Sequence, residues 1–245
     1  MEVAPAGHVT LLFTDIEGST RLARELAGDW PAVLAGHHTI LEREIAAREG
    51  FVEGTAGDSF LAMFTDPRAA VATAVAIQRA LAAHPWPARM DGLRVRMGIH
   101  SGVVDRLGDG FVGIDIHLAA RVQGVAHGGQ IVVTEPTRRL VASGFELAPL
   151  GEHRLKDFPE PERLFQVVVD GRGPGTFPPL RSAPARPTNL PVELRPLLGR
   201  EGELAALREA VLGDDRRLHT ITGLGGTGKT RLALAAASCP CRPGP

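Results

Sequence analysis

The stretch VTLLFTDIEGSTRL, Val9 to Leu22, joins an apolar run to a helix-start signature through a single aspartate. The apolar residues predict a buried strand, and Ser19 or Thr20 predicts the N-cap of a helix. Backbone N–H groups at a helix start attract phosphate, which the nearby Asp15 repels. A divalent cation between the aspartate and the phosphate removes that conflict. The stretch therefore predicts a metal-assisted phosphate site.

The segments after this stretch predict an α+β fold. We expect, in order, an interrupted helix toward Glu49 with a break at Trp30-Pro31, two strands around a turn in GFVEGTAGDSFLAMF (50–64), a helix from Asp66-Pro67, and a strand in LRVRMGIHSG (93–102). This βαββαβ order is typical of a ferredoxin-like fold. A helix over 113–126, a strand at 130–134, a short helix from Pro136 and closing strands near 145–151 and 164–169 are expected to follow.

Bulk properties exclude several classes of protein. A chain of 245 residues suits one complete core and part of a second. Its formal net charge of −1 gives no electrostatic reason to expect nucleic acid or an anionic membrane as a partner. We expect a cytoplasmic protein, because no run is long enough to span a bilayer and the first residues lack a signal-peptide pattern. The only cysteines, Cys239 and Cys241, lack the second pair that a zinc site needs.

A proline-rich segment divides the chain. Residues 171–197 show neither helical nor strand periodicity, so we expect a semi-extended linker between a first domain, 1–170, and a second unit, 198–245. In the second unit, an amphipathic helix and a β-like run precede GLGGTGKT (223–230), which fits the P-loop pattern GxxxxGK[ST].

The P-loop pattern predicts a phosphate cradle. Its glycines, among them Gly223 and Gly228, let backbone N–H groups wrap phosphates, while Lys229 reaches the outer phosphates and Thr230 can bind Mg²⁺. This unit resembles the start of the signal-transducing ATPase modules of multidomain bacterial regulators, including LuxR-type ones. The few residues that follow leave no room for an acidic Walker B strand. We therefore expect a truncated P-loop fragment, from a shortened or frame-altered gene product, and no ATP hydrolysis by it.

Two carboxylates of the first domain are candidates for metal binding. Asp15 ends the first strand and Asp58 lies in the turn TAGDSF, so a βαββ arrangement brings both to one edge of the sheet. Together they can hold two divalent ions, which clamp a triphosphate, lower the pKa of an attacking hydroxyl and offset charge on the leaving group. Backbone N–H groups of 16–20 then face the phosphates. On these two residues alone, the alternative of a strand cap and an ordinary hairpin turn stays open.

Several motifs in a fixed order favour the metal site over the strand cap and the ordinary hairpin turn. FTDIEGST, GTAGDSFLAMF, MGIHSG, GDGFVGIDIHLAARV and HGGQIVVT resemble the catalytic domain of class III adenylate and guanylate cyclases, over roughly Val9 to Val169. The resemblance implies a ferredoxin-like core with additional strands and helices. It also implies an active site formed between two cyclase domains, and hence a homodimer.

The resemblance further implies roles for individual residues. The metal ligands for two Mg²⁺ or Mn²⁺ ions are Asp15 and Asp58, assisted by the Ile16 carbonyl. Arg121 matches the arginine that stabilises charge on the α-phosphate, and Lys156 falls near the lysine that binds the triphosphate. The triphosphate also meets the loop formed by Glu17, Gly18, Ser19 and Thr20.

Three positions depart from the family pattern. Gly54 and Gly110 replace the base-selecting lysine and aspartate, and His117 replaces the ribose-orienting asparagine. An imidazole can donate or accept one hydrogen bond and so partly replace the amide, but glycine replaces neither charged group. Losing polar contacts to the base reduces discrimination between adenine and guanine. Losing the ribose contact misplaces the 3′-hydroxyl and slows the reaction.

These residues predict a cyclase that turns a purine nucleoside triphosphate, ATP rather than GTP, into cyclic monophosphate and pyrophosphate with weak activity. A second interpretation is a catalytically silent module that binds nucleotide or dimerises to regulate a downstream ATPase. A third is a phosphatase, because LLFTDIEGST is superficially similar to the DxD nucleophile motif of haloacid-dehalogenase-like enzymes. That motif normally has a second aspartate where this chain has Glu17.

The histidines are expected to play lesser parts. His100, at a strand end in GIHSG, is expected to be structural or to support the site indirectly rather than to act as a base. His37 and His38 lack carboxylate or cysteine partners at ligand spacing, so we expect them on the surface.

Overall fold

The computed structural model describes residues 7–108, 110–141, 143–173, 175–184, 199–213, 219–223 and 226–237. The features expected from the sequence that lie outside these ranges are Cys239, Cys241, positions 224 and 225 of the P-loop pattern, and 185–197 of the linker. The chain divides into two compact units, Met1–Ala185 and Arg186–Pro245.

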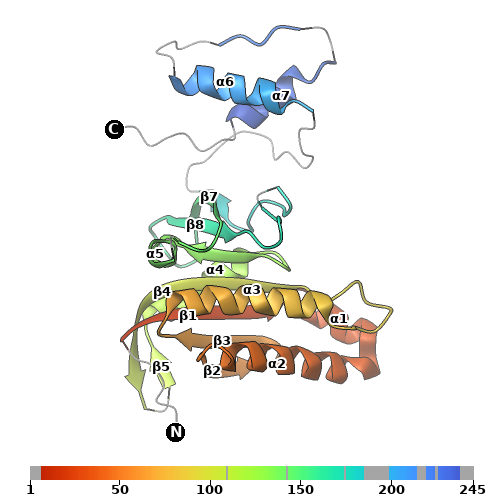
Figure 1. Ribbon diagram of the computed structural model, residues 1–245, viewed down its shortest axis with the longest axis vertical. Helices are drawn as coiled ribbons and strands as arrows, with labels where there is room; N and C mark the ends of the chain where they lie inside the picture. Colours follow the sequence, from red (N-terminus) through yellow and green to blue (C-terminus); the bar gives the residue numbers. More distant parts are fainter. Residues whose placement is uncertain are drawn as a thin grey trace. The chain divides into compact units, whose positions relative to one another are not determined.

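The first unit is built on one mixed sheet. Its strands are β1 (Gly7–Ile16), β2 (Phe51–Ala56), β3 (Ser59–Phe64), β4 (Val95–Leu107), β5 (Gly110–Val112), β6 (Ile131–Thr134), β7 (Leu147–Arg154), β8 (Glu162–Val167) and β9 (Ala183–Pro184). Their order is β2-β3-β1-β4-β6-β8-β7-β9, with β5 paired to β4. Only the β4–β6 pair is parallel among these described strands. β1 thus lies between β3 and β4 (Figure 1).

Helices cover both faces of this sheet. They are α1 (Ser19–Leu26), the 3₁₀ turn η1 (Ala27–Asp29), α2 (Trp30–Ala46), α3 (Pro67–Ala83), α4 (Ile114–Val125) and α5 (Glu135–Leu140). The elements up to β4 confirm the predicted ferredoxin-like βαββαβ core with its additional strands and helices. β5 and β9 were not predicted, because strands of three and two residues carry no readable alternation.

The helix starts show one agreement and one difference. Asp66 caps α3 as predicted, because its Oδ1 accepts a hydrogen bond from the backbone N of Arg68 at 2.9 Å. The N-cap of α1 is Gly18 rather than Ser19 or Thr20. Gly18 has a φ of 72°, a left-handed conformation that glycine adopts at little cost. The turn after β1 therefore needs glycine rather than a hydroxyl cap.

Successive side chains of β1 point to opposite faces of the sheet and enter two different apolar cores. Leu12 and Ile16 belong to the larger core, which α2 and α3 cover (Figure 1). Val9 and Leu11 point to the opposite face, where Ala119 of α4 packs against them. By the same two-residue period, Asp15 belongs to the α4 face of the sheet.

A glycine in β4 allows α4 to approach the sheet closely. A Cβ atom added to Gly98 would lie 2.2 Å from the backbone N of Gln123. The backbone of α4 therefore rests directly on β4 at this point. This contact sets the distance from the sheet of the α4 backbone that carries Arg121, two residues before Gln123.

The described part of the predicted linker packs against the first unit. We call residues 175–184 the C-terminal strap. Leu180 of the strap is buried in an apolar cluster with Leu118 and Val122 of α4. At its end, β9 pairs with β7, with Ala183 opposite Arg154. The folded unit therefore extends to residue 184.

The second unit contains two described helices, α6 (Glu201–Gly213) and α7 (Lys229–Ala237), both in segments expected to be helical. The β-like run before the P-loop pattern forms no strand at 219–223, the part of it that the structure describes. None of the helices in the described ranges is long and apolar enough to cross a membrane.

The contact at Gly98 gives a stability prediction. Gly98→Ala should lower the free energy of unfolding by about 2–3 kcal/mol, because the new methyl group overlaps the backbone of α4. Gly124→Ala is the matched control, since nothing lies within 4 Å of its added Cβ and alanine favours the helix by about 0.5–1 kcal/mol. Urea unfolding followed by circular dichroism measures both. Equal stability of the two variants would contradict the close contact.

Candidate functional site

Two reciprocal hydrogen bonds bring the predicted metal ligands together. The backbone N of Ile16 donates to Asp58 Oδ2 at 3.0 Å. Ser59 Oγ donates to Asp15 Oδ1 at 2.9 Å. Each carboxylate is thus tied to the chain neighbour of the other, across the antiparallel pair β1–β3. The expected convergence at one edge of the sheet is present, while the metal-binding role stays a prediction.

Arg96 is a residue of this site that the sequence did not reveal. It stands opposite Asp15 in the β1–β4 register, and its Nη2 forms an ion pair with Asp15 Oδ2. The two side chains are only 21% and 19% exposed. The Arg96 Nε is buried and has no hydrogen-bond partner in the described residues. Cross-strand register depends on the turns and bulges of the whole sheet, so β4 alone gave no indication of this pair.

The donor atoms suit a hard divalent cation. Two carboxylates and a backbone carbonyl are oxygen ligands of the kind that Mg²⁺ and Mn²⁺ prefer. No group of three or more His, Cys, Asp or Glu side chains gathers in metal-binding geometry within the described residues. Asp15, Asp58 and the Ile16 carbonyl therefore fit a metal whose remaining ligands come from phosphate or water. Arg96 already places one positive charge at Asp15.

The loop after β1 offers fewer N–H groups than predicted. The Ile16 N–H is used by Asp58, and the Glu17 N–H donates to the carbonyl of Arg94 at 2.8 Å. Gly18, Ser19 and Thr20 donate no backbone hydrogen bond within the described part of the chain. The predicted phosphate contact from backbone groups is therefore limited to residues 18–20, at the start of α1.

A second group of predicted residues lies along α4 and the end of β7. Arg121 donates from Nη2 to Asp157 Oδ2 at 2.7 Å, and its buried Nε has no partner in the described residues. His117 is exposed one helical turn earlier. Arg121 and the exposed Lys156 line the same cavity, of about 520 Å³. No hydrogen bond or ion pair of the described residues joins Arg121 or Lys156 to the two aspartates.

Of the two positions predicted to face the base, Gly110 lies beside the side chain of Glu53, the residue before Gly54. Gly54 follows a register shift in β2, and Gly110 begins β5. A Cβ added to Gly110 would lie 3.4 Å from Oε1 of Glu53. A carboxylate thus stands beside the place that the family's base-selecting aspartate would occupy. The β2 irregularity that directs Glu53 there has no sequence signature of its own.

The expectation that His37 lies on the surface is wrong. Its side chain is fully buried on α2, with its ring centroid 5.8 Å from that of Phe60. Burial, together with the neighbouring His38, lowers the pKa of His37 to about 4, and Asp15 opposes the change. Helical spacing alone did not show that α2 turns this residue inward. His38 is half-buried, and its Nε2 lies 2.9 Å from the Gly57 carbonyl.

His100 is buried and makes hydrogen bonds within the fold, but it lies inside β4 rather than at a strand end as expected. Its Nδ1 lies 2.8 Å from Thr134 Oγ1, and its Nε2 lies 3.2 Å from Asp115 Oδ1. Burial lowers the pKa of His100, and the hydrogen bond with Asp115 partly offsets this. Asp115 also accepts from the backbone N of Val103 at 2.6 Å. His100 thus links β4 and β6 to the start of α4 without facing the predicted ligands.

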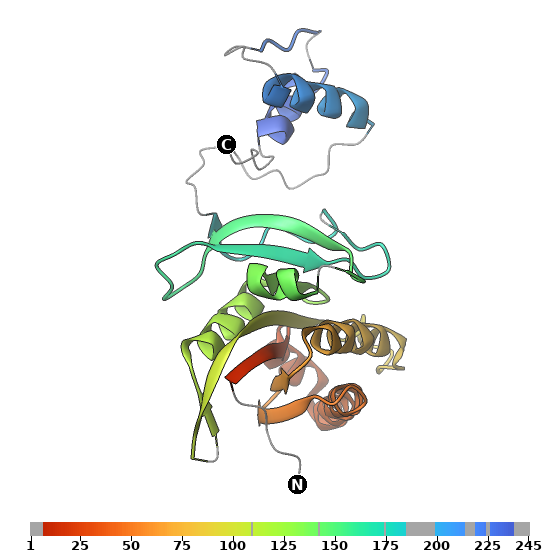
Figure 2. The ribbon, with the colours of Figure 1, turned by 60° about the vertical axis from the view of Figure 1, so that its left-hand side comes forward.

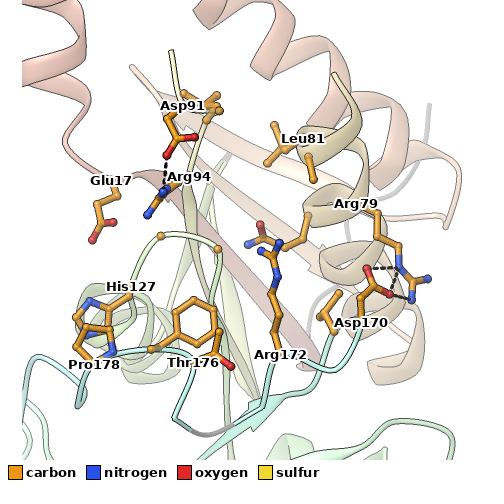
Figure 3. A pocket seen from close by; sticks show the side chains of 18 of the residues that line it. Glu17, Arg79, Leu81, Asp91, Arg94, His127, Asp170, Arg172, Thr176 and Pro178 are labelled. Carbon is orange, nitrogen blue, oxygen red and sulfur yellow. Dashed lines mark hydrogen bonds and ion pairs between the residues drawn. The ribbon is translucent and has the colours of Figure 1, made fainter. Parts of the chain in front are cut away.

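A larger cavity, of about 870 Å³, lies beside α3. Figure 3 shows Glu17 and Arg94 on one side of it and the pair of Arg79 with Asp170 on the other. Arg79 Nη2 lies 2.7 Å from Asp170 Oδ1. Of the residues predicted to act on substrate, only Glu17 lines this cavity. Arg121 and His117 do not line this cavity, but the loop after β1 reaches it through Glu17.

Known proteins share this fold and these motifs. Residues 1–169 match the family described as the adenylate and guanylate cyclase catalytic domain. An uncharacterized protein of Mycobacterium tuberculosis is 36% identical over 210 residues, which cover 82% of this chain and 70% of that protein. A receptor-type adenylate cyclase of Trypanosoma brucei brucei is 31% identical over 69% of this chain but only 17% of its own length.

Solved structures agree with the sequence matches. An adenylate cyclase of Trypanosoma brucei, solved as a monomer, is 30% identical with a TM-score of 0.65, covering 76% of this chain and 98% of that chain. The adenylyl cyclase CyaB of P. aeruginosa is 25% identical with a TM-score of 0.63, covering 70% of this chain and 98% of that chain.

The buried histidine gives a pH prediction. An unfolded histidine titrates near 6.5, whereas the pKa of folded His37 is about 4, so the unfolded state binds more protons between these values. Stability should therefore fall as pH falls through this window, by about 2 kcal/mol from this residue between pH 7 and pH 5. His37→Leu should flatten the pH dependence of urea unfolding. His8→Leu, at an exposed position, should leave it unchanged; equal slopes for both variants would contradict the buried neutral state.

Proposed function

The chain belongs to the family of adenylate and guanylate cyclase catalytic domains, and we propose that it converts a purine nucleoside triphosphate into a cyclic monophosphate and pyrophosphate. The observation that carries this proposal is the reciprocal hydrogen bonding that holds Asp15 and Asp58 together beside the start of α1. We propose ATP as the preferred substrate, because named relatives of about 30% identity are adenylate cyclases.

The proposed reaction uses this chain's groups in three places. Asp15, Asp58 and the Ile16 carbonyl would hold Mg²⁺ or Mn²⁺, which when bound neutralises phosphate charge and favours ionisation of the 3′-hydroxyl. The N–H groups of residues 18–20 orient the triphosphate. Arg121 stabilises negative charge on the α-phosphate while the 3′-oxygen forms its bond to phosphorus and pyrophosphate leaves.

Two features support a homodimer with a shared site. No hydrogen bond or ion pair of the described residues joins Arg121 to the two aspartates, which suits a site that a second chain completes. The β4–β5 hairpin extends from the body of the sheet (Figure 2). Leu107 of this hairpin and Ile114, the first residue of α4, are 67% and 66% accessible. Apolar side chains exposed together indicate a surface that becomes covered.

The degenerate residues support weak activity with little base discrimination. Glycine at positions 54 and 110 makes no side-chain hydrogen bond to a base, and the His117 imidazole has no neighbour in the described residues that fixes its ring. A catalytically silent module that binds nucleotide and dimerises is the alternative. It shares the fold and the phosphate-binding loop but forms no product.

The second unit supports a separate proposal of phosphate binding by the P-loop pattern. Lys229, the first residue of α7, donates from Nζ to the Gly223 carbonyl at 2.8 Å. Gly226 and Gly228 have φ values of 75° and 79°, which open the loop backbone toward a bound anion. Thr230 follows in the first turn of α7. The described residues of this unit form only the helices α6 and α7 as regular elements, with no strand.

Product formation tests the main proposal. Purified protein with Mn²⁺ and either ATP or GTP should form cyclic nucleotide slowly, and Arg121→Ala should reduce the rate by about 100- to 1,000-fold. Asp15→Ala supplies the background, because it removes a proposed metal ligand. Product is measured by liquid chromatography. If the parent protein forms no more product than Asp15→Ala does, catalysis is excluded and the silent module remains.

Mixing two inactive variants tests the shared site. Equal amounts of Asp15→Ala and Arg121→Ala should recover about a quarter of the parental activity, because half of the dimers are mixed and each mixed dimer has one intact site. Neither variant alone should recover. A mixture as inactive as its components, at concentrations where the dimer forms, would place both residues in one chain's site.

The exposed apolar hairpin gives a further prediction. Leu107→Asp with Ile114→Asp should shift the protein from dimer to monomer in size-exclusion chromatography and abolish cyclase activity, because a charge opposes burial at the interface. The thermal unfolding midpoint of the variant monomer should equal that of the parent monomer if both substituted side chains are exposed within one chain. Full activity in a monomeric variant would contradict the dimeric site.

A further inference from the structure

The cavity beside α3 has both charged and apolar walls. Its volume of about 870 Å³ lies within the range of small-molecule sites, about 300–1,000 Å³. The apolar part of its lining includes Leu81, Leu93 and Phe177. The charged part consists, among the described residues, of four arginines and three carboxylates, namely Arg79, Arg94, Arg172, Arg181, Glu17, Asp91 and Asp170. The arginines therefore exceed the carboxylates by one positive charge.

The excess charge belongs to Arg172. The other three arginines each have a carboxylate partner, as Arg79 with Asp170, Arg94 with Asp91, and Arg181 of the strap with Glu17. Arg172 makes no side-chain hydrogen bond or ion pair with any residue that the structure describes. The hydrogen bond from Arg79, and to a smaller extent the charge of Arg172, lowers the pKa of Asp170. Asp170 is thus already engaged by Arg79, and the Arg172 guanidinium is left for a ligand.

A tight turn after β8 fixes the backbone of Arg172. The Arg172 N–H donates to the carbonyl of Val169 at 2.9 Å, and Asp170 and Gly171 have φ values of 50° and 76°. Positive φ at both central residues is typical of a type I′ turn, for which Asp-Gly is a favoured sequence. The Arg172 carbonyl also accepts from Nε2 of Gln166 at 2.9 Å. The guanidinium therefore extends from a backbone that is held on both sides.

Two buried glutamines join this turn to the opposite wall of the cavity. Gln166 Oε1 accepts from Nε2 of Gln130 at 2.9 Å, and both side chains are buried. Gln130 Oε1 in turn accepts from the backbone N of His127 at 3.0 Å. His127 Nε2 lies 2.9 Å from the carbonyl of Pro179 in the strap. Because satisfied buried amides hold their neighbours in one arrangement, the cavity is preformed, which lowers the cost of binding.

The apolar patch lies at the same cavity as the Arg172 side chain. Leu81 and Leu93 are buried, and Phe177 of the strap is half-buried. A Cβ added to Gly129 would lie 3.8 Å from Cε1 of Phe177, so the ring covers the turn that precedes β6. Figure 3 shows the Arg172 side chain reaching from its turn into the cavity. A ligand bound there meets a cation and an apolar surface together.

We propose that this cavity binds a small organic monoanion, with its carboxylate on Arg172 and its apolar body against Leu93 and Phe177. A guanidinium binds a carboxylate through charge-assisted, often bidentate, hydrogen bonds. The three carboxylates of the lining repel additional negative charge, so a single charge fits better than a polyphosphate. Arg172 and Phe177 follow the residues that match the cyclase family, 1–169. The site does not rest on the proposed cyclase activity.

Titration with octanoate tests the charged part of the site. Octanoate is added to the full chain in a calorimeter without nucleotide or metal, so the outcome does not depend on catalysis. Arg172→Gln should weaken octanoate binding about tenfold, because it removes the charge-assisted hydrogen bonds. Arg163→Gln is the matched control and should change binding less than about twofold, because Arg163 is exposed on β8 and does not line the cavity.

Two further probes separate the charge from the apolar body. Acetate has the carboxylate without the chain, and 1-octanol has the chain without the charge. Each should bind the parent protein at least tenfold more weakly than octanoate, because each makes only one of the two kinds of contact. Affinity for either probe equal to that for octanoate would contradict the proposed ligand class.

A variant with the opposite expected sign guards against misfolding. Asp170→Asn should tighten octanoate binding about two- to threefold, because it removes a negative charge that acts on Arg172. Asn-Gly keeps the type I′ turn, so the backbone of Arg172 is preserved. Unfolding caused by a substitution can weaken binding but cannot produce this gain. No octanoate binding by the parent protein, or unchanged affinity in both Arg172→Gln and Asp170→Asn, would overturn the proposal.

Discussion

The position of β1 between β3 and β4 is the constraint on which the site depends. Antiparallel pairing on both sides places Asp15 within reach of Ser59 on one neighbour and Arg96 on the other. Neither contact is local in sequence, so both exist only when the central strands are in register. The same alternation sends Leu12 and Ile16 into the core, which fixes that register through apolar burial.

Much of the first unit was predictable because its signals are local. The apolar run of β1, the Asp66 cap and the glycine-rich turn before Asp58 each specify an element without distant contacts. What the sequence did not show depends on tertiary contacts. Arg96 needed the sheet register and Arg181 needed the return of the strap. The burial of His37 needed the orientation of α2.

Resemblance and structure complement each other at the candidate site. The motifs predicted roles for Asp15, Asp58 and Arg121 that no hydrogen bond could indicate. The structure, in turn, shows that Glu53 and Arg181 stand among the groups that the motifs identified. Both belong to irregular features, a register shift and a proline-rich segment, where sequence patterns carry little information.

The central place of β1 also has a consequence for biosynthesis. β1 (Gly7–Ile16) is synthesised before both of its partners, and the second of them, β4, ends only at Leu107. One edge of this apolar strand has no partner until β3 is made, and the other edge has none until β4 is made. Such a nascent chain offers a template for unwanted strand addition. Slower folding and a longer exposure of this strand during synthesis follow from placing an interior strand ahead of both of its partners in the chain.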